Sequence, residues 1–244
     1  MRLQVLSDIH TEFHNDSGEQ FIRDYLRPKD VDVLIIAGDL AGVGCIEKTV
    51  ALLAKAYHNS WILFVPGNHE YYGGSIPKIN HKMRHIFRQF ENTVFLNNKM
   101  ISLNGIDFVG TPMWFRHNNE NVTFSNRIND FRMIQNFDSV VVTENKKALN
   151  FLNWHVSSNS IVITHHVPTM KSLANNFQHD PTNMFFVCSM EKMIKKRNPK
   201  MWIHGHTHHS ANHLLGKTHI VCNPLGYVGH QVNPEFIANM MFDV

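Results

Sequence analysis

The residues best suited to chemistry stand in five short groups spread along the chain. Each group offers carboxylate, amide or imidazole side chains, and none contains a cysteine. Such oxygen and nitrogen donors suit Mn, Fe, Zn, Co or Ni better than a soft metal or an all-oxygen calcium site. The pattern therefore predicts a metal centre. The groups are Asp8-Ile9-His10, Gly38-Asp39, Gly67-Asn68-His69-Glu70, Thr164-His165-His166 and His204-Gly205-His206-Thr207-His208.

The number of donors favours two divalent ions over one. Two ions roughly 3.5–4 Å apart acidify a bridging water and bind phosphoryl oxygens, which overcomes the resistance of a phosphate ester to an anionic nucleophile. Such a site needs one bridging carboxylate and several terminal ligands. Two carboxylates against two dications leave positive charge, so an anionic substrate is expected. The candidate ligands are Asp8, His10, Asp39, Asn68, His165, His206 and His208.

These donors need rigid positions, and short strands that end just before them would provide those positions. Strands are predicted over residues 3–6, 31–37, 61–65, 161–163 and 201–203, because each range is apolar and rich in β-branched or aromatic residues. An Asp-x-His or His-x-His pair in extended backbone sends both side chains to the same side. Asp8 is therefore expected to converge with His10, and His206 with His208.

The remaining pattern predicts an alternation of strands and helices. Helices over 21–26, 46–57 and 76–90 separate the first strands, which implies parallel pairing with crossover connections. Asn104-Gly105 predicts a hairpin between strands at 100–103 and 106–109. Thr143 is expected to cap a helix over 143–156. A strand at 94–96, a helix at 190–196 and a strand at 218–222 complete the prediction. Loops 111–138 and 170–185 are expected over the site.

Composition limits the classes of protein. The 244 residues are 43% hydrophobic, enough for a single domain over 1–244. A formal charge of +3 is too small to favour a nucleic-acid partner. Cys45, Cys188 and Cys222 form no C-x-x-C pair, which favours reduced thiols. Asp8 comes too early for a signal peptide, and no apolar stretch approaches the roughly 18 residues that span a bilayer. We expect a cytoplasmic protein with no membrane partner.

In their order along the chain, the five groups resemble the calcineurin-like metallophosphoesterase superfamily. Asn129-Asp130-Phe131-Arg132 and the segment from Cys222 to Tyr227 further resemble a bacterial subgroup of small stand-alone phosphoesterases. The fold that this resemblance implies is α/β: a four-layer α-β-β-α sandwich in which two mixed sheets pack face to face with helices outside.

The resemblance also implies roles for the donors. Asp8, His10 and His208 would hold one metal, Asn68, His165 and His206 the other, and Asp39 would bridge the two, with manganese as the expected metal. A bridging hydroxide would attack phosphorus in line. His69 would stabilise the phosphoryl oxygens or protonate the leaving group, as an imidazole can near neutral pH.

One departure from the family pattern concerns the partner of His69. Many members carry an acid a few residues after Gly-Asp that orients the catalytic histidine, but residues 40–44 are Leu-Ala-Gly-Val-Gly. Glu70 or a backbone carbonyl could take that role instead. His166 and His204 are expected to support the site rather than to bind metal, and His209, His213 and His219 to lie at the surface.

Three functions compete on these residues. The first is a hydrolase of small phosphate mono- or diesters, the second is a nuclease on the same core, and the third is a non-catalytic scaffold. The presence of every expected ligand disfavours the third. In the first loop, Arg127 and Arg132 either bind phosphate or, as we expect, form ion pairs with Asp130. The aromatic residues Tyr71, Tyr72, Trp114 and Phe115 either stack on a base or pack in the core.

Overall fold

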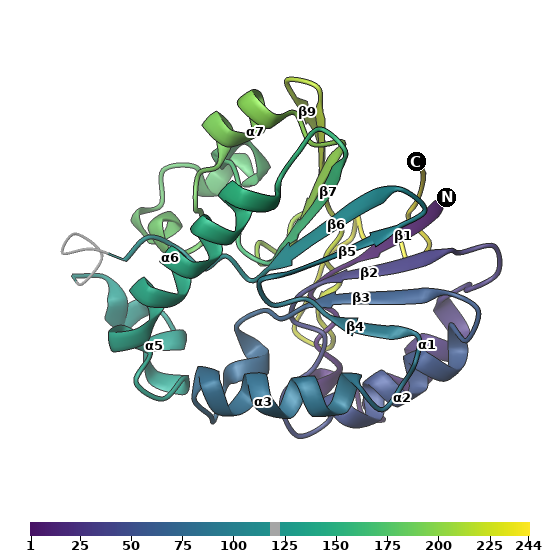
Figure 1. Ribbon diagram of the computed structural model, residues 1–244. Helices are drawn as coiled ribbons and strands as arrows, with labels where there is room; N and C mark the ends of the chain where they lie inside the picture. Colours follow the sequence, from purple (N-terminus) through teal and green to yellow (C-terminus); the bar gives the residue numbers. More distant parts are fainter. Residues whose placement is uncertain (118–122) are drawn as a thin grey trace.

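Two β-sheets lie face to face at the centre of the computed structural model, which describes residues 1–117 and 123–244 (Figure 1). The first sheet has the strand order β13-β1-β2-β3-β4, in which β1 to β4 are parallel and β13 is antiparallel. Its strands are β1 (Arg2–Leu6), β2 (Val33–Ala37), β3 (Trp61–Val65), β4 (Thr93–Phe95) and β13 (Met241–Asp243).

The second sheet has the order β5-β6-β7-β8-β10-β9, with antiparallel pairs at its two edges. The β5–β6 hairpin turns at Asn104 and Gly105, whose φ angles of 49° and 79° are what a two-residue turn of this kind needs. Its strands are β5 (Lys99–Leu103), β6 (Ile106–Thr111), β7 (Ser160–Thr164), β8 (Met201–His204), β9 (Ala211–Leu215) and β10 (Thr218–Cys222). A separate small sheet joins β11 (Gly226–Tyr227) to β12 (Gln231–Val232).

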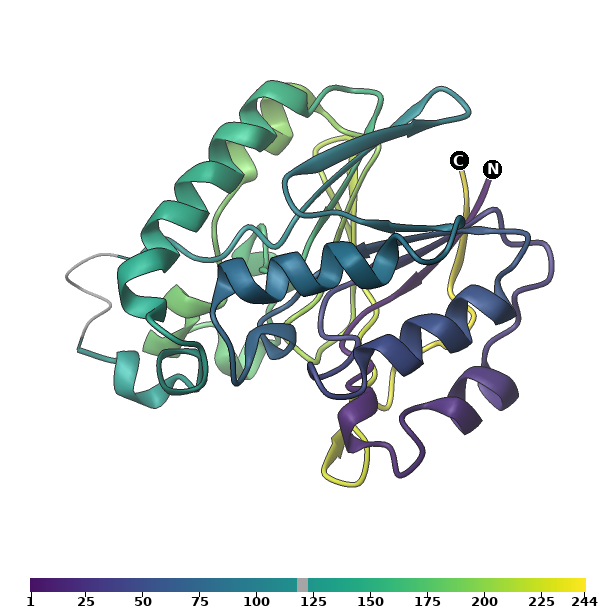
Figure 2. The same cartoon turned by 60° about the horizontal axis from the view of Figure 1, so that its bottom comes forward.

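Helices cover the outer face of each sheet, which confirms the predicted four-layer fold. Figure 2 brings forward the three helices of the first sheet, and α6 and α7 lie against the second sheet. The helices are α1 (Glu19–Tyr25), α2 (Ile46–Ala56), α3 (Ile76–Phe87), α5 (Asp130–Met133), α6 (Phe137–His155) and α7 (Glu191–Arg197). In the part of the chain that the structure describes, no helix is both long and apolar enough to cross a membrane.

The start of α6 differs from the prediction. The helix begins at Phe137, so Thr143 lies inside it, exposed, and caps nothing. Phe137 and Val141 are buried in a hydrophobic cluster that also contains residues of the first sheet. This burial extends the helix toward its N-terminus, beyond the start expected at Thr143. Tertiary packing outweighs the local capping signal here.

The core lies in three layers because the strands alternate in the direction of their side chains. Val33 and Ile35 of β2 face the second sheet, where they join Phe108 of β6 and Ile163 of β7. Leu34 and its alternate neighbours face the helices instead. All residues of β2 are therefore buried, which explains the continuous apolar run in its sequence.

The two long loops have local structure of their own. The first contains a short 3-10 helix (Ser125–Arg127) and α5, and its residues 118–122 lie outside the described residues. The second contains three 3-10 helices (Met170–Ser172, Asn175–Phe177 and Pro181–Phe185). Trp114 and Phe115 are buried in the core, so they pack and do not offer a stacking surface.

Replacement of Phe108 by alanine should leave a cavity between the two sheets. Because this ring is fully buried, we expect a loss of about 3–5 kcal/mol in the free energy of unfolding, measured with denaturant. Trp154→Ala is the control, since this side chain is 82% exposed and its loss should change stability by less than about 0.5 kcal/mol. Equal effects of the two changes would contradict the layer assignment.

Candidate metal centre

The seven predicted ligands follow the carboxyl ends of five parallel strands, three in the first sheet and two in the second. They bring together two groups of donor atoms, and within each group the atoms lie within 4.8 Å of one another. One group consists of Asp8, His10 and His208, and the other of Asp39, His165 and His206. Asn68 joins the second group, because its Oδ1 lies 3.0 Å from His165 Nε2.

Asp39 belongs to the second group and also approaches the first. Its Oδ2 is 3.6 Å from His10 Nε2 in one group and 3.4 Å from His165 Nε2 in the other. No other carboxylate among the described residues approaches a histidine of each donor group in this way. A ligand shared by two ions would occupy this place.

The donor set fits divalent cations. Asp8 and Asp39 are buried, yet among the described residues their ion-pair partners are histidines and not lysines or arginines. His10 Nε2 and His208 Nε2 face each other at 3.0 Å, an approach of two lone pairs that a cation or a proton must relieve. Buried carboxylates that face imidazole nitrogens are an ordinary metal-binding set.

The ionisation of His206 and His208 agrees with this fit, whereas a metal would have to displace a proton from His165. Burial lowers the pKa of His206 and of His208, which keeps these rings in the neutral form that binds metal. Burial also acts to lower the pKa of His165, but the Asp39 carboxylate outweighs it and raises that pKa to about 10. The same attraction holds the pKa of Asp39 well below its usual range, although burial acts to raise it.

The backbone that positions these donors is not extended, which corrects the sequence expectation. Asp8, His10 and Asp39 have φ near 50°, and His206 and His208 have φ of 77° and 49°. These left-handed turns aim the side chains inward from the strand ends. Asp8 and His10 do meet in one group, whereas His206 and His208 belong to different groups. Non-glycine residues in this region carry strain that is commonly found at functional sites.

Two glycines make the close approach of the loops possible. A Cβ atom at Gly67 would lie 2.1 Å from Asp39 Oδ1, and one at Gly205 would lie 2.6 Å from Asp8 Oδ2. Any side chain at either position would therefore displace a carboxylate of the donor groups. Glycine precedes Asn68 and His206 in the sequence for this steric reason.

The Glu70 side chain makes no hydrogen bond with the His69 ring; it joins two loops instead. Its carboxylate accepts hydrogen bonds from the backbone N–H groups of Asp39 (3.1 Å), Leu40 (2.7 Å), Ala41 (3.1 Å) and Gly67 (2.6 Å). The loop after β2 and the loop after β3 are thereby held at a fixed separation. Burial, together with the charge of Asp39, raises the pKa of Glu70 to about 8.

The partner of His69 is Glu12, which the sequence analysis missed. Glu12 Oε1 lies 3.0 Å from His69 Nδ1 and 3.1 Å from His10 Nδ1, while Oε2 accepts the backbone N–H of Gly42 at 2.9 Å. Glu12 thus replaces the acid that residues 40–44 lack, and binds to that same loop. Burial acts to raise the pKa of Glu12, but its hydrogen bonds with His10 and His69 lower it to about 2. The signal available in the sequence was the spacing Asp8-x-His10-x-Glu12.

The other ring nitrogen of His69 faces the pocket. His69 Nε2 lies 3.1 Å from the hydroxyl of Tyr227, a residue to which the sequence analysis gave no role. Burial acts to lower the pKa of His69, but the charge of Asp39 and the hydrogen bond with Glu12 outweigh it and raise that pKa to about 9.

The predicted ion pairs of Asp130 are wrong. Asp130 is buried and points toward the donor groups, where its Oδ1 accepts hydrogen bonds from Asn68 Nδ2 at 2.9 Å and the Tyr72 hydroxyl at 2.8 Å. Arg132 donates to the side chain of Asn129, and the guanidinium of Arg127 lies 5.3 Å from the centre of the Phe124 ring. The spacing of charges in sequence did not show that Asp130 faces inward.

The remaining histidines lie around the donor groups. His166 and His204 are buried, outside both groups, and hydrogen-bonded to the carbonyl oxygens of Pro112 and Gly205. The His166 ring lies 4.5 Å from that of His206, and burial lowers the pKa of His166 to about 3. His209 is partly exposed and lines the pocket.

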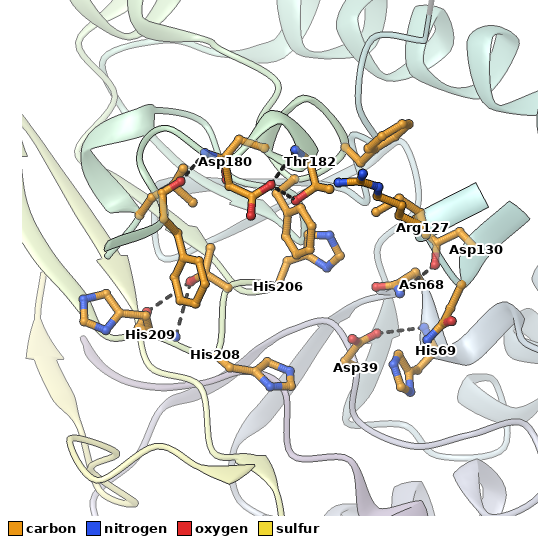
Figure 3. Close-up of a pocket in the computed structure, with 18 of the residues that line it drawn as sticks. Asp39, Asn68, His69, Arg127, Asp130, Asp180, Thr182, His206, His208 and His209 are labelled. Atoms are coloured by element: carbon orange, nitrogen blue, oxygen red, sulfur yellow. Dashed lines mark hydrogen bonds between the residues drawn. The ribbon is translucent and has the colours of Figure 1, made fainter. Parts of the chain in front are cut away.

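The donor groups open into a pocket of about 370 Å³, shown in Figure 3. Asp39, Asn68, His69, His206 and His208 form one part of its lining. Residues of both long loops form much of the rest, among them Arg127, Asp130, Phe177, Asp180 and Thr182.

Comparison with known families gives one match that covers most of the chain. The model of the calcineurin-like phosphoesterase family matches residues 1–210. An uncharacterised protein of Acanthamoeba polyphaga mimivirus is 26% identical over 264 aligned residues, which cover 95% of this chain and 92% of that protein. An uncharacterised metallophosphoesterase of Helicobacter pylori is 29% identical over 127 residues, which cover 50% of this chain and 32% of that protein.

Solved structures share the fold. The phosphopantetheinyl hydrolase PptH from Mycobacterium tuberculosis superposes with a TM-score of 0.72 at 14% identity, over 92% of this chain and 89% of that one. TT1561 of Thermus thermophilus superposes with a TM-score of 0.58 at 14% identity, over 91% and 88% of the two chains.

Glu70→Gln should loosen both loops of the centre. Above pH 8, where a carboxyl with the raised pKa of Glu70 is ionised, the charge-assisted hydrogen bonds are lost in this variant, because the amide offers one acceptor oxygen and its NH₂ group would face backbone N–H donors. We expect about 1.5–3 kcal/mol less stability in chemical denaturation of the metal-free protein, and weaker metal binding by calorimetry. Glu19→Gln is the matched control, because its ion pair with Lys48 is exposed. Unchanged stability of Glu70→Gln would show that the loops do not depend on this carboxylate.

Proposed function

This chain belongs to the calcineurin-like phosphoesterase family, and on that premise we propose that it hydrolyses phosphate mono- or diesters at a dinuclear metal centre. The observation that carries the proposal is the place of Asp39, whose Oδ2 lies between a histidine of each donor group. A mononuclear site would need only one of these groups.

The residues divide between the two ions as the donor groups do. Asp8, His10 and His208 would hold one ion, Asn68, His165 and His206 the other, and Asp39 both, with manganese as the metal proposed. Two divalent ions supply a nucleophile from water and neutralise charge on the phosphoryl oxygens. Asp130 orients Asn68 for this task, because it accepts a hydrogen bond from Nδ2 and so leaves Oδ1 facing the centre.

His69 is the proposed acid. Glu12 accepts the hydrogen bond of Nδ1–H and so fixes the orientation of the ring, with Nε2 directed into the pocket. A proton on Nε2 can be donated to the oxygen of the leaving group as the bond between phosphorus and that oxygen breaks. The Tyr227 hydroxyl already lies within hydrogen-bond distance of Nε2. The leaving-group oxygen would approach Nε2 on this same side of the ring.

The pocket favours a small substrate. A volume of about 370 Å³ suits a small organic phosphate, and it supports this class over a polynucleotide. The structural neighbour from Mycobacterium tuberculosis is a phosphopantetheinyl hydrolase, and esters of that group are therefore one class to include in a substrate panel. The cytoplasmic location expected from the sequence stays a prediction.

Metal loading tests the reaction. Protein treated with a chelator should lose activity on p-nitrophenyl phosphate and bis-p-nitrophenyl phosphate, and Mn should restore it together with a higher Tm. Elemental analysis should find two ions per chain in the active form. Absence of turnover with Mn, Fe, Zn, Co and Ni at full occupancy would rule the proposal out. Oligonucleotide cleavage that falls steeply with salt would instead support the nuclease.

His69→Ala separates the chemistry from metal binding. We expect metal content to stay at the wild-type level while kcat falls by roughly 10²–10⁴, because general acid catalysis contributes about that factor. The loss should be larger for alkyl phosphates than for nitrophenyl phosphates, since a poor leaving group needs its proton more. His58→Ala, at an exposed position away from the pocket, is the control. A full rate on alkyl esters in His69→Ala would refute the role of His69.

A further inference from the structure

The pocket extends well beyond the two donor groups. Figure 3 shows Asp39 and His69 on one side of it and Arg127 and Thr182 on the other. This second side is built from the two long loops and contains no residue of the donor groups. A substrate that fills the pocket must therefore present something other than its scissile phosphate to Arg127.

Arg127 is the one arginine or lysine among the described residues that line the pocket. Its guanidinium lies against the face of the Phe124 ring, which supports the group without using its N–H donors. Among the described residues, Arg127 takes part in no ion pair; the arginines and lysines that do are Arg2, Arg23, Lys48, Lys147 and Lys195. The planar fork of donors is thus left for a ligand, and it matches phosphate and carboxylate oxygens.

Asp180 is an acidic residue of the same pocket that senses the charge of Arg127, but its carboxylate is engaged in hydrogen bonds with Thr182. Its Oδ1 accepts the backbone N–H of Thr182 at 2.7 Å and the Thr182 hydroxyl at 2.6 Å, which begin the 3-10 helix Pro181–Phe185. These bonds, and to a smaller extent the charge of Arg127, lower the pKa of Asp180. Among the described residues the two side chains form no ion pair, so Asp180 serves the loop and leaves Arg127 available.

Apolar side chains form a further wall of the pocket. Phe186 lies with its ring 4.5 Å from the His206 ring, and Leu173 and Phe177 continue the wall along the second loop. Phe177 is 54% exposed, so its ring is open to contact. A carbon chain or ring of a substrate could lie against this wall while polar groups engage at each end.

We propose that Arg127 binds a second anionic group of the substrate. The substrate class is then a small organic phosphate ester with an apolar middle portion and a further phosphate or carboxylate, and not a simple monoanionic ester. This inference rests on the proposed function, because it places the scissile phosphate at the donor groups.

A series of matched esters tests the proposal in the metal-loaded enzyme. Bisphosphates of linear alkanediols with three to six carbons are compared with the monophosphates of the same diols, and with alkanoates that carry one phosphate ester. At the best spacer length, kcat/KM for the bisphosphate should exceed that for the monophosphate by about tenfold or more, mainly through KM. This factor corresponds to about 1.4 kcal/mol. The phosphate and carboxylate arms distinguish the two kinds of anion.

Variants then assign the preference to one side chain. Arg127→Ala should reduce bisphosphate kcat/KM to the monophosphate level and leave monophosphate turnover within about threefold, while Arg127→Lys should retain part of the preference. Arg23→Ala, which removes an exposed arginine outside the pocket, should change nothing. Wild-type enzyme without a preference at any spacer length, or Arg127→Ala that keeps it, would overturn the proposal.

A binding measurement keeps this result separate from the reaction. Alkane bisphosphonates and alkyl phosphonates cannot be hydrolysed, and calorimetry should show tighter binding of the bisphosphonate to wild type but not to Arg127→Ala. Enzyme that cleaves no ester at all would refute the proposed function, yet these affinities would still decide whether Arg127 binds the second anion. Equal affinities of the two phosphonates for wild type would refute the anion site alone.

Discussion

Four backbone amides share one buried carboxylate, that of Glu70, where β2 and β3 of the first sheet end. The amides belong to the loops that carry Asp39 and Asn68, so their spacing is set by a single side chain. Without it, several N–H groups would be buried with no acceptor, which is costly in an interior that excludes water. These hydrogen bonds of Glu70 hold Gly67 against the Asp39 carboxylate. The position of Asp39 beside both donor groups therefore depends on Glu70.

The stacking of two sheets explains why seven residues from distant parts of the chain meet. Parallel strands present their carboxyl ends at one edge, and β1, β2 and β3 do so in one sheet while β7 and β8 do so in the other. The apolar layer between the sheets holds these edges together. Left-handed turns at five of the donors then direct the side chains inward, and rigid strands behind them keep that strained backbone in place.

The sequence was most informative where strong local patterns and the order of motifs agree. The strands before Asp39 and Asn68 are continuous apolar runs, and the Asn104-Gly105 turn has a steric cause that is visible in two residues. The start of α6 escaped prediction because burial of Phe137 is a tertiary effect. Glu12, Asp130 and Tyr227 were missed or misassigned because their partners are distant in sequence, and one sequence without its contacts does not reveal which way a polar side chain turns.

Asp130 and Arg127 stand three positions apart on one short segment, and they line the same pocket with different contacts. Asp130 holds the amide of Asn68 beside the donor groups, and Arg127 lines the outer side of the pocket. A mutation that reshapes this segment to accept a new ligand would also shift the support of Asn68. On the roles proposed for Arg127 and Asn68, selectivity and cation affinity are therefore not free to evolve separately, and a graft of the segment from a relative should carry Asn68, Tyr72 and Asp130 as one unit.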